Sequence, residues 1–347
     1  MELTFSRNNE AIEGLIDALM KTAGGVHHPR IIREMFITAL KAGQESDYPA
    51  DLKLILSTMK EMRYTNKVFA PYRDRRKVTI FGSSRIQPDA AVYQACVRFS
   101  RELARRGYMI ITGGGPGIMQ AGNEGAGSEN SFAVNIRLPI EQAPNPIMTD
   151  TNRLITYKYL FNRKVAFVRE SQAIAIFPGG FGTFDEAMEV FTLIQTGKTP
   201  PRPLVLFDDG SGFWHHWLEF IKNRLLGMSL ISGEDFSLFT ITSDVDEAVA
   251  VIEDFYRNYH SLRFVGRKLV IRLNRELSAE EILTIENEFP ELCEPGTRIT
   301  ATPALPEEED EPDLLHLPRI LVSFDHRHYG LLMACIWRIN SFTAPER

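Results

Sequence analysis

The sequence predicts an α/β protein whose centre is a parallel sheet with helices on both faces. Between Val78 and about Tyr259, short apolar runs of strand length alternate with segments whose apolar residues recur every three or four positions. Glycine-rich turns follow several of the short runs, as is common where a parallel strand gives way to a helix. We expect three parts: an N-terminal helical region at 1–76, the α/β core at 77–259 and a small C-terminal α+β appendage at 262–347.

Residues 1–76 have the pattern of helices. Apolar residues fall at helical spacing in three stretches, separated by glycine-rich or polar breaks: Ala11–Leu19, Ile31–Leu40 and Leu52–Met62. The basic cluster Arg73–Lys77, interrupted only by Asp74, then precedes the first strand. A charge run of this kind is usually a solvated linker, but it could also contact an anion or a partner, and both interpretations stay open.

The core begins with a strand at Val78–Phe81 and a helix at Ala90–Arg106. The further expected strands are Tyr108–Thr112, Phe132–Ile136, Ala173–Phe177 and Leu204–Phe207. The further expected helices are 117–126, Leu160–Val168, Ala187–Gln195, Phe213–Leu225 and Asp244–Tyr259. Ligands of parallel sheets bind beyond the carboxyl ends of the strands. Three turns are expected to converge there: Gly82–Arg85, Gly113–Gly115 and Pro178–Thr183.

Residues 262–347 follow a different pattern. We expect a βαββα arrangement of these segments: Lys268–Leu273, a helix that opens with a capping box at Ser278, Thr297–Thr302, Arg319–Phe324 and Tyr329–Ile339. An acidic loop flanked by prolines lies at Pro306–Pro312. This part shows no catalytic constellation, so we expect a regulatory or assembly role for it.

The stretch Pro178–Glu186 is the most informative in the chain. Glycines at 179, 180 and 182 lie between an expected strand and an expected helix, where backbone amides can approach a ligand closely. A helix N-terminus adds partial positive charge, so this turn predicts a phosphate site. Glu186 adds a carboxylate that a phosphate cradle does not need, which suggests chemistry on a phosphorylated small molecule.

A plainer interpretation of the same residues stays open. Thr183 and Glu186 stand at the spacing of a capping box, in which each side chain accepts a hydrogen bond from the other residue's backbone amide. A cap does not require three glycines, and the two roles could coexist.

Gly113–Gly117 is the second strong signal, because it too follows a strand and opens a helix. A dinucleotide fingerprint in either possible register would need glycine where Ile118 or Gln120 stands. The next strand ends in Asn135–Arg137 and not in the acid that binds a ribose diol. These departures disfavour a classical dinucleotide site.

Composition excludes several classes of protein. The chain has 347 residues, of which 44% are hydrophobic and 24% charged, as in soluble globular proteins. Its net charge of −6 gives no indication of nucleic-acid binding. There is neither an apolar run of about 18 residues nor a signal peptide, so no membrane contact is expected. Three widely spaced cysteines argue against a disulfide framework and favour a cytoplasmic protein.

No metal or cofactor is expected. The histidines stand in adjacent pairs or flank an arginine, without carboxylates or cysteines at ligand spacing. Arg163 and Lys164 fall on an expected helix, where an isolated pair of this kind is usually a surface pair. Lys164 could in principle form a Schiff base, but nothing around it forms a recognisable pyridoxal phosphate site.

In this order the motifs resemble the LOG family, the cytokinin-activating 5′-monophosphate phosphoribohydrolases, whose members are often labelled lysine decarboxylases. The resemblance covers about residues 77–257. Its motifs are Gly113–Met119, Asn135–Ile136 with Leu138–Gln142, Asn162–Lys164, Pro178–Glu186 and Leu193–Lys198. The family implies a Rossmann-like sheet, a homodimer or higher homo-oligomer, no cofactor, and hydrolysis of a nucleoside 5′-monophosphate to base and ribose 5-phosphate. The flanking regions resemble in layout the larger bacterial purine/pyrimidine nucleotide nucleosidases.

The resemblance also implies roles for particular residues. Arg163 and Glu186 match the two catalytic residues of the family. The residues that match its substrate-binding positions are Gly82, Ser83, Ser84, Gly115, Met119, Gly179, Gly180, Gly182 and Thr183.

The residue patterns and the family resemblance indicate the same mechanism. A phosphate held by the amides of 179–183 would place the anomeric carbon of the ribose near Glu186, whose carboxylate stabilises an oxocarbenium-like transition state. A nucleotide sensor without turnover is the alternative, and a pyridoxal-dependent decarboxylase is a third hypothesis. The presence of both Arg163 and Glu186 favours hydrolysis, because binding alone needs neither.

The sequence also suggests a symmetric dimer with sites near its interface. Two expected helical regions, around 155–168 and 185–196, have more apolar side chains than one covered sheet face needs: Tyr157, Tyr159, Phe161, Phe191 and Leu193.

Overall fold

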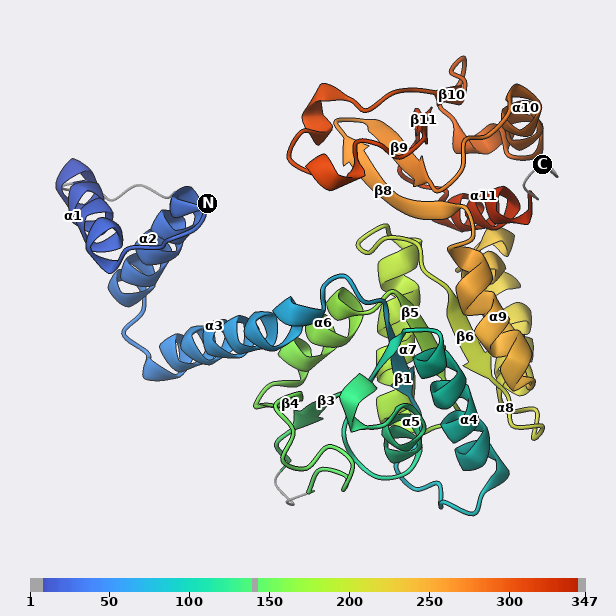
Figure 1. Cartoon of the computed structure of the whole chain (residues 1–347), viewed down its shortest axis with the longest axis horizontal. Helices are drawn as coiled ribbons and strands as arrows, with labels where there is room; N and C mark the ends of the chain where they lie inside the picture. The colour runs from blue at the N-terminus through green and yellow to red at the C-terminus, as the bar shows by residue number, and fades with distance from the viewer. Residues whose placement is uncertain (1–8, 139–142, 343–347) are drawn as a thin grey trace. The chain divides into compact units, whose positions relative to one another are not determined.

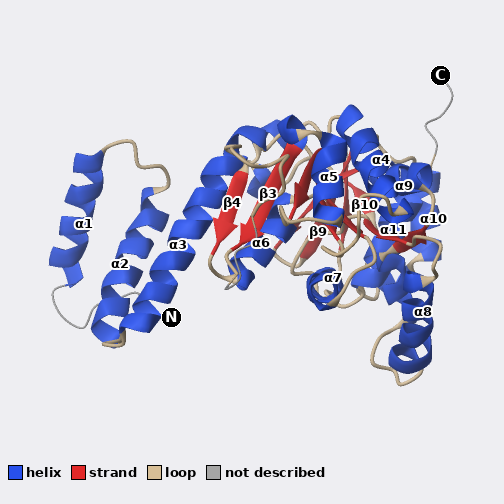
Figure 2. Ribbon diagram, turned by 90° about the horizontal axis from the view of Figure 1, so that it is seen from below, coloured by secondary structure: helices blue, strands red, loops and turns tan. Residues whose placement is uncertain are grey.

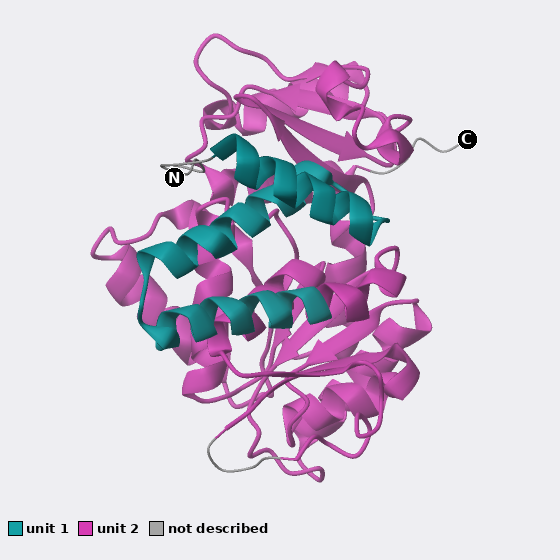
Figure 3. Ribbon diagram, turned by 90° about the vertical axis from the view of Figure 1, so that its left-hand side faces the viewer, with its two compact units in different colours: residues 1–64 teal, residues 65–347 magenta. Residues whose placement is uncertain are grey.

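The computed structural model of the chain describes residues 9–138 and 143–342 (Figure 1). The chain divides into two units, residues 1–64 and 65–347 (Figure 3). Part of the stretch Leu138–Gln142, which contributes to the family resemblance, lies outside the described residues.

The first unit is helical, as predicted. It contains α1 (Asn9–Ala23), α2 (Pro29–Glu45) and most of α3 (Pro49–Phe69). Gly24 and Gly25 end α1 with positive φ angles of 66° and 61°, which glycine adopts without the strain of a Cβ. A small cluster of buried side chains holds α1 and α2 together: Ile16, Met20 and Ile37.

The core of the second unit is a seven-stranded sheet in the order β4-β3-β2-β1-β5-β6-β7, with every neighbouring pair parallel. Its strands are β1 (Lys77–Phe81), β2 (Met109–Thr112), β3 (Ser131–Ile136), β4 (Leu154–Tyr157), β5 (Ala173–Ile176), β6 (Leu204–Phe207) and β7 (Thr240–Thr242). The predicted parallel sheet is therefore confirmed.

Helices cover both faces of this sheet (Figure 2). They are α4 (Ala91–Arg105), α5 (Ile118–Ala126), α6 (Leu160–Glu170), α7 (Phe181–Gln195), α8 (Phe213–Phe220) with a π-helical continuation at Ile221–Leu226, and α9 (Val245–Phe255). Alternate residues of β1 face opposite sides. Val78 and Ile80 pack with α4, α5 and α9, whereas the Thr79 hydroxyl donates to the carbonyl of Phe167 in α6.

Two edge strands are absent from the sequence prediction. Most of β4 falls in the region around 155–168 that was expected to be helical, and β7 was not expected at all. Each pairs with only one neighbour, and they are four and three residues long. Their residues thus lack the continuous apolar run that marks a strand buried on both sides.

The appendage is a four-stranded antiparallel sheet in the order β10-β11-β9-β8, with two helices. Its elements are β8 (Tyr259–Val265), β9 (Lys268–Leu273), α10 (Ala279–Glu288), β10 (Thr300–Ala301), β11 (Arg319–Val322) and α11 (Tyr329–Ser341). The predicted βαββα order is confirmed but lacks the first strand. The prediction extended the preceding helix to Tyr259, whereas α9 ends at Phe255.

Helix α11 attaches the appendage to the core. The Asn340 side chain accepts from the backbone amides of Asn258 and Tyr259, both at 2.8 Å, and donates to the Phe255 carbonyl at 2.6 Å. Trp337 packs edge-to-face on Phe255, with ring centroids 5.0 Å apart. None of the described helices combines the length and apolar character needed to cross a membrane.

Candidate active site

The strand order places a ligand crevice beside β1. From β1 the chain adds β2, β3 and β4 on one side of the sheet, and from β5 it adds β6 and β7 on the other side. Ligands of α/β sheets bind where the strand order reverses in this way. The turns that follow β1 and β5 lie together, because the Ser83 amide donates to the Pro178 carbonyl at 3.0 Å. The Ile118 amide donates to the Ser83 carbonyl at 3.0 Å, which adds the start of α5 to the group.

A cavity of about 790 Å³ opens at this edge. All of the predicted site residues except Gly179 line it: Gly82, Ser83, Ser84, Gly115, Met119, Arg163, Gly180, Gly182, Thr183 and Glu186. Gly179 is half-buried, and a Cβ there would come within 2.2 Å of the Thr183 hydroxyl oxygen. Its glycine is required by packing within the turn.

Helix α7 presents free amides to the cavity. It begins at Phe181, with Gly180 as its N-cap and no side-chain cap. The amides in the first turn of a helix have no intrahelical acceptor. At Gly180 and Gly182 an added Cβ would meet nothing within 4 Å, so both positions are open to a ligand.

The capping-box interpretation of Thr183 and Glu186 is wrong. Thr183 is the third residue of α7 rather than its cap, because the helix starts three residues earlier than that spacing requires. Glu186 is therefore left without a capping role.

The second glycine turn is held from beneath by three polar side chains. The Thr112 hydroxyl accepts from the Gly114 amide at 3.0 Å and donates to the Asn123 side chain at 2.7 Å. The Asn145 side chain donates to the Gly115 carbonyl at 3.2 Å and to Asn123 Oδ1 at 2.9 Å. These positioning residues were not predicted from the sequence, since Asn145 lies in an unpatterned loop 30 residues from its partner.

Arg163 of α6 and Glu186 of α7 face each other across the cavity. Arg163 Nη2 lies 3.5 Å from Glu186 Oε1, and their side chains are 13% and 16% exposed. The interpretation of Arg163 as a surface residue is thus wrong. Neighbouring Lys164 is also paired, with Asp185 at 2.7 Å and Glu189 at 3.2 Å.

Burial controls the charge of this pair. It raises the pKa of Glu186 to about 7, although the positive charge of Arg163 acts in the opposite direction. Burial also lowers the pKa of Arg163, and Glu186 counteracts that change. The guanidinium lies 5.1 Å from the centre of the Phe167 ring, and its Nε has no hydrogen-bond partner in the described part of the chain. Such a carboxyl can change its protonation state near neutral pH.

The cavity also contains residues that the sequence analysis did not single out. Phe181 is 96% exposed at the first position of α7, and Leu160 is 54% exposed at the start of α6. Their exposure could not be inferred from a pattern, since apolar residues at helix starts usually pack inward. Among residues 9–138 and 143–342 there is no group of three histidine, cysteine or acidic side chains that could hold a metal ion.

Comparison with known proteins agrees with this geometry. The model of a family described as "Possible lysine decarboxylase" matches residues 116–252. The cytokinin riboside 5′-monophosphate phosphoribohydrolase LOG2 of Arabidopsis thaliana is 25% identical over 183 residues, which cover 52% of this chain and 84% of LOG2. The α/β core of this chain is similar to proteins of the LOG family.

A bacterial relative also aligns with this core. The pyrimidine/purine nucleotide 5′-monophosphate nucleosidase of Escherichia coli K12 is 30% identical over 163 residues, covering 41% of this chain and 35% of the nucleosidase. This chain thus spans about a third of that enzyme. A solved structure, that of TM1055, aligns with a TM-score of 0.37 at 22% identity and covers 51% of this chain and 98% of TM1055.

Proposed function

We propose that this protein hydrolyses the N-glycosidic bond of a nucleoside 5′-monophosphate to release the base and ribose 5-phosphate. One observation carries the proposal: a buried carboxylate, Glu186, lies in the same cavity as the free amides of the α7 N-terminus. A phosphate anchor beside an acid is what cleavage at the anomeric carbon of a phosphoribosyl group requires. The relatives, named phosphoribohydrolases and a nucleosidase, support the same reaction.

The first turn of α7 would bind the 5′-phosphate. Its amides have no intrahelical acceptor, and the helix dipole favours an anion at this end. The exposed backbone at Gly180 and Gly182 lets the phosphate oxygens approach without a side chain in the way. The volume of about 790 Å³ falls within the usual range for small-molecule sites.

Glu186 would act when positive charge develops on the ribose. As the bond between the anomeric carbon and the base nitrogen lengthens, the ribosyl group becomes oxocarbenium-like, and an ionised carboxylate stabilises it. A water oxygen then bonds to the anomeric carbon, while the base departs with the electrons of the broken bond. The carboxylate can orient that water and accept its proton, a role that suits a group whose pKa is about 7.

Arg163 would hold Glu186 in its ionised form. Its guanidinium is 3.5 Å from the carboxylate, and its positive charge lowers the pKa that burial raises. Arg163 also lines the cavity, so its guanidinium could contact the phosphate or the ribose. We also propose that the protein acts in the cytoplasm as a homodimer.

The decisive experiment is a comparison of nucleotides with their nucleosides. A panel of 5′-monophosphates and the matching nucleosides is incubated with the protein, and ribose 5-phosphate or ribose is quantified. We expect the monophosphate to be cleaved at least roughly tenfold better, since a charge-assisted contact contributes about 1.5–3 kcal/mol. Equal rates on AMP and adenosine would remove the phosphate assignment, and no release from any nucleotide would favour a sensor.

A further inference from the structure

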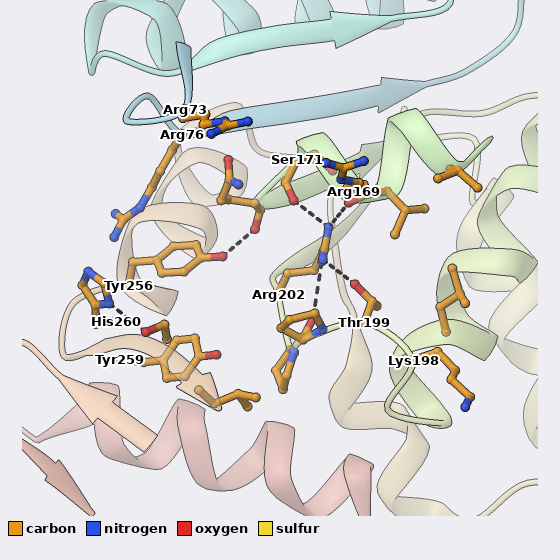
Figure 4. Close-up of a pocket in the computed structure, with 18 of the residues that line it drawn as sticks. Arg73, Arg76, Arg169, Ser171, Lys198, Thr199, Arg202, Tyr256, Tyr259 and His260 are labelled. Carbon is orange, nitrogen blue, oxygen red and sulfur yellow. Dashed lines mark hydrogen bonds between the residues drawn. The ribbon is translucent and has the colours of Figure 1, made fainter. Parts of the chain in front are cut away.

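A second cavity, of about 690 Å³, lies toward the amino ends of the central strands. Figure 4 shows it in close-up. It is bordered by the segments just before β1, β5 and β6 and by the first residues of β8. The catalytic cavity lies instead where β1 and β5 end. The two cavities thus lie toward opposite ends of the same strands and share one lining residue, Lys164.

Positive charge dominates the lining of this second cavity. Seven arginine or lysine side chains line it but only two carboxylates, those of Asp74 and Glu189. Glu189 is already paired with Lys164 at 3.2 Å. Within the described part of the chain, Arg73, Arg76 and Lys198 have no carboxylate within ion-pair distance.

Arg202 lies at the centre of the cavity and is only 6% exposed (Figure 4). It donates to the carbonyls of Val168 at 2.5 Å and Ser171 at 2.6 Å, and to the hydroxyl of Thr199. These acceptors are neutral, and no acidic side chain of the described residues pairs with this guanidinium. A buried charge without a counter-ion is costly, so a bound anion would stabilise this arrangement.

The side of the second cavity that contains Tyr256 and His260 is also positively charged. The guanidinium of Arg76 lies 4.2 Å from the centre of the Tyr256 ring, and the Tyr256 hydroxyl donates to the Gln172 carbonyl at 2.6 Å. Burial and the charge of Arg76 both lower the pKa of His260, as expected in a positive field. The basic cluster Arg73–Lys77, which the sequence left open between linker and anion contact, thus contributes to a preformed cavity.

We propose that this second cavity binds a phosphorylated small molecule with at least two negative charges. Arg73 and Arg76 would contact its phosphate oxygens, and Arg202 would supply the buried positive charge beneath it. The volume admits a molecule the size of a nucleotide, and the site is distinct from the one where hydrolysis is proposed.

The test uses pyrophosphate as the probe and isothermal titration calorimetry as the readout. The variant Gly182→Asp first repels anions from the catalytic cavity, where the position is open and an aspartate suits a helix N-terminus. We expect this variant still to bind one pyrophosphate. Adding Arg73→Gln and Arg76→Gln should weaken that binding roughly tenfold or more, because two charge-assisted contacts are lost.

A matched control removes the same charge elsewhere. Lys222→Gln with Arg224→Gln, both on an exposed segment, should leave the affinity of the Gly182→Asp protein unchanged. The proposal is overturned if Gly182→Asp shows no saturable binding, or if both pairs of substitutions have the same effect. Calorimetry does not depend on turnover, so failure here leaves the proposed hydrolysis untouched, and the reverse also holds.

Discussion

At the scale of single residues, the proposed chemistry depends mainly on Glu186 and Arg163. Glu186 and Arg163 come from different helices, face each other at 3.5 Å and are both largely buried. In the proposed reaction the carboxylate would respond to positive charge on the ribose, and the guanidinium would adjust how readily it ionises. Predictions at this scale concern the charge of each group.

Replacing Glu186 by glutamine should lower turnover by roughly 10²–10⁴-fold, the usual contribution of a positioned acid or base. The amide keeps the shape of the side chain but cannot stabilise a developing cation. AMP affinity and melting temperature should change little, and all three quantities are measured on the same preparation. Glu189→Gln, one turn further along α7, is the control and should keep most of the turnover. Near-wild-type turnover of Glu186→Gln would end the catalytic assignment.

The pH dependence should report the same carboxyl. Its folded-state pKa is raised to about 7, and the reaction needs the ionised form, so kcat/KM should rise with pH and level off above about 7. The positive charge of Arg163 lowers this pKa, so Arg163→Gln should move the midpoint to higher pH in its residual activity. Arg169→Gln, exposed on the same helix, should not move it. A midpoint near 4.5, the ordinary value for a glutamate, would contradict the assignment.

The sequence identified the candidate catalytic pair but could not predict its geometry. The resemblance pointed to Arg163 and Glu186, whereas their burial and mutual distance depend on how α6 and α7 pack. Spacing alone favoured a surface position for Arg163 and left a capping box open for Glu186. Both interpretations were wrong, because Arg163 is only 13% exposed beside Glu186 and α7 starts three residues earlier than a cap at Thr183 requires.

At the scale of elements, the glycine turns determine the site. Strand-turn-helix patterns predicted β1, β2 and β5 and the convergence of their turns. The edge strands β4 and β7 and the first appendage strand β8 were missed, because short or half-exposed strands have no continuous apolar run. Support from Asn145 was also missed, since it arises only when a distant loop folds onto the Gly113–Gly117 turn.

Replacing two glycines of these turns by alanine should have different effects. Gly182 has open space around it and an ordinary φ, so Gly182→Ala should fold normally but raise KM for the nucleotide, because its methyl group enters the phosphate site. Gly117 has φ +66°, and a Cβ there would lie 2.3 Å from the Ser83 carbonyl oxygen, so Gly117→Ala should lower the melting temperature.

Gly43→Ala is the control for the added methyl group, since its surroundings in α2 are also open. It should change neither KM nor the melting temperature appreciably. An unchanged KM for Gly182→Ala would place the phosphate elsewhere.

At the scale of the whole molecule, the expected dimer stays a prediction. Two of the side chains that suggested a dimer are used within one chain: Tyr157 is fully buried, and Phe191 stacks on Trp217 with ring centroids 5.5 Å apart. The argument from those two is therefore wrong. Phe161 and Val165 remain 49% and 45% exposed, one turn apart on α6, and Val165 also lines the second cavity.

We predict a dimer whose interface includes that face of α6. Light scattering should give twice the mass of one chain, and Phe161→Glu with Val165→Glu should give a monomer with reduced activity, because charges would be buried against the partner. Phe220→Glu, at a 57% exposed residue outside this face, is the control. A fully active monomer of the unmodified protein would refute the prediction.

The appendage should matter for stability more than for chemistry. Asn340→Ala would leave two backbone amides and one carbonyl without their partner, so we expect a loss of about 3 kcal/mol or more in the free energy of unfolding. Urea unfolding measures the loss, and turnover per folded molecule at low temperature should stay near that of the unmodified protein. The exposed Asn223→Ala is the control, and a similar drop in its stability would contradict this account.

Lys164 is shared by the two cavities, since it lines both and bridges Asp185 of one to Glu189 of the other. A ligand that draws this ammonium group away in one cavity changes the free energy of binding in the other. Thermodynamic linkage makes such an effect reciprocal: if an anion in the second cavity changes the affinity for nucleotide by some factor, nucleotide must change the affinity for that anion by the same factor. Measuring each binding constant with and without the other ligand would show whether this one lysine makes the enzyme responsive to a second metabolite.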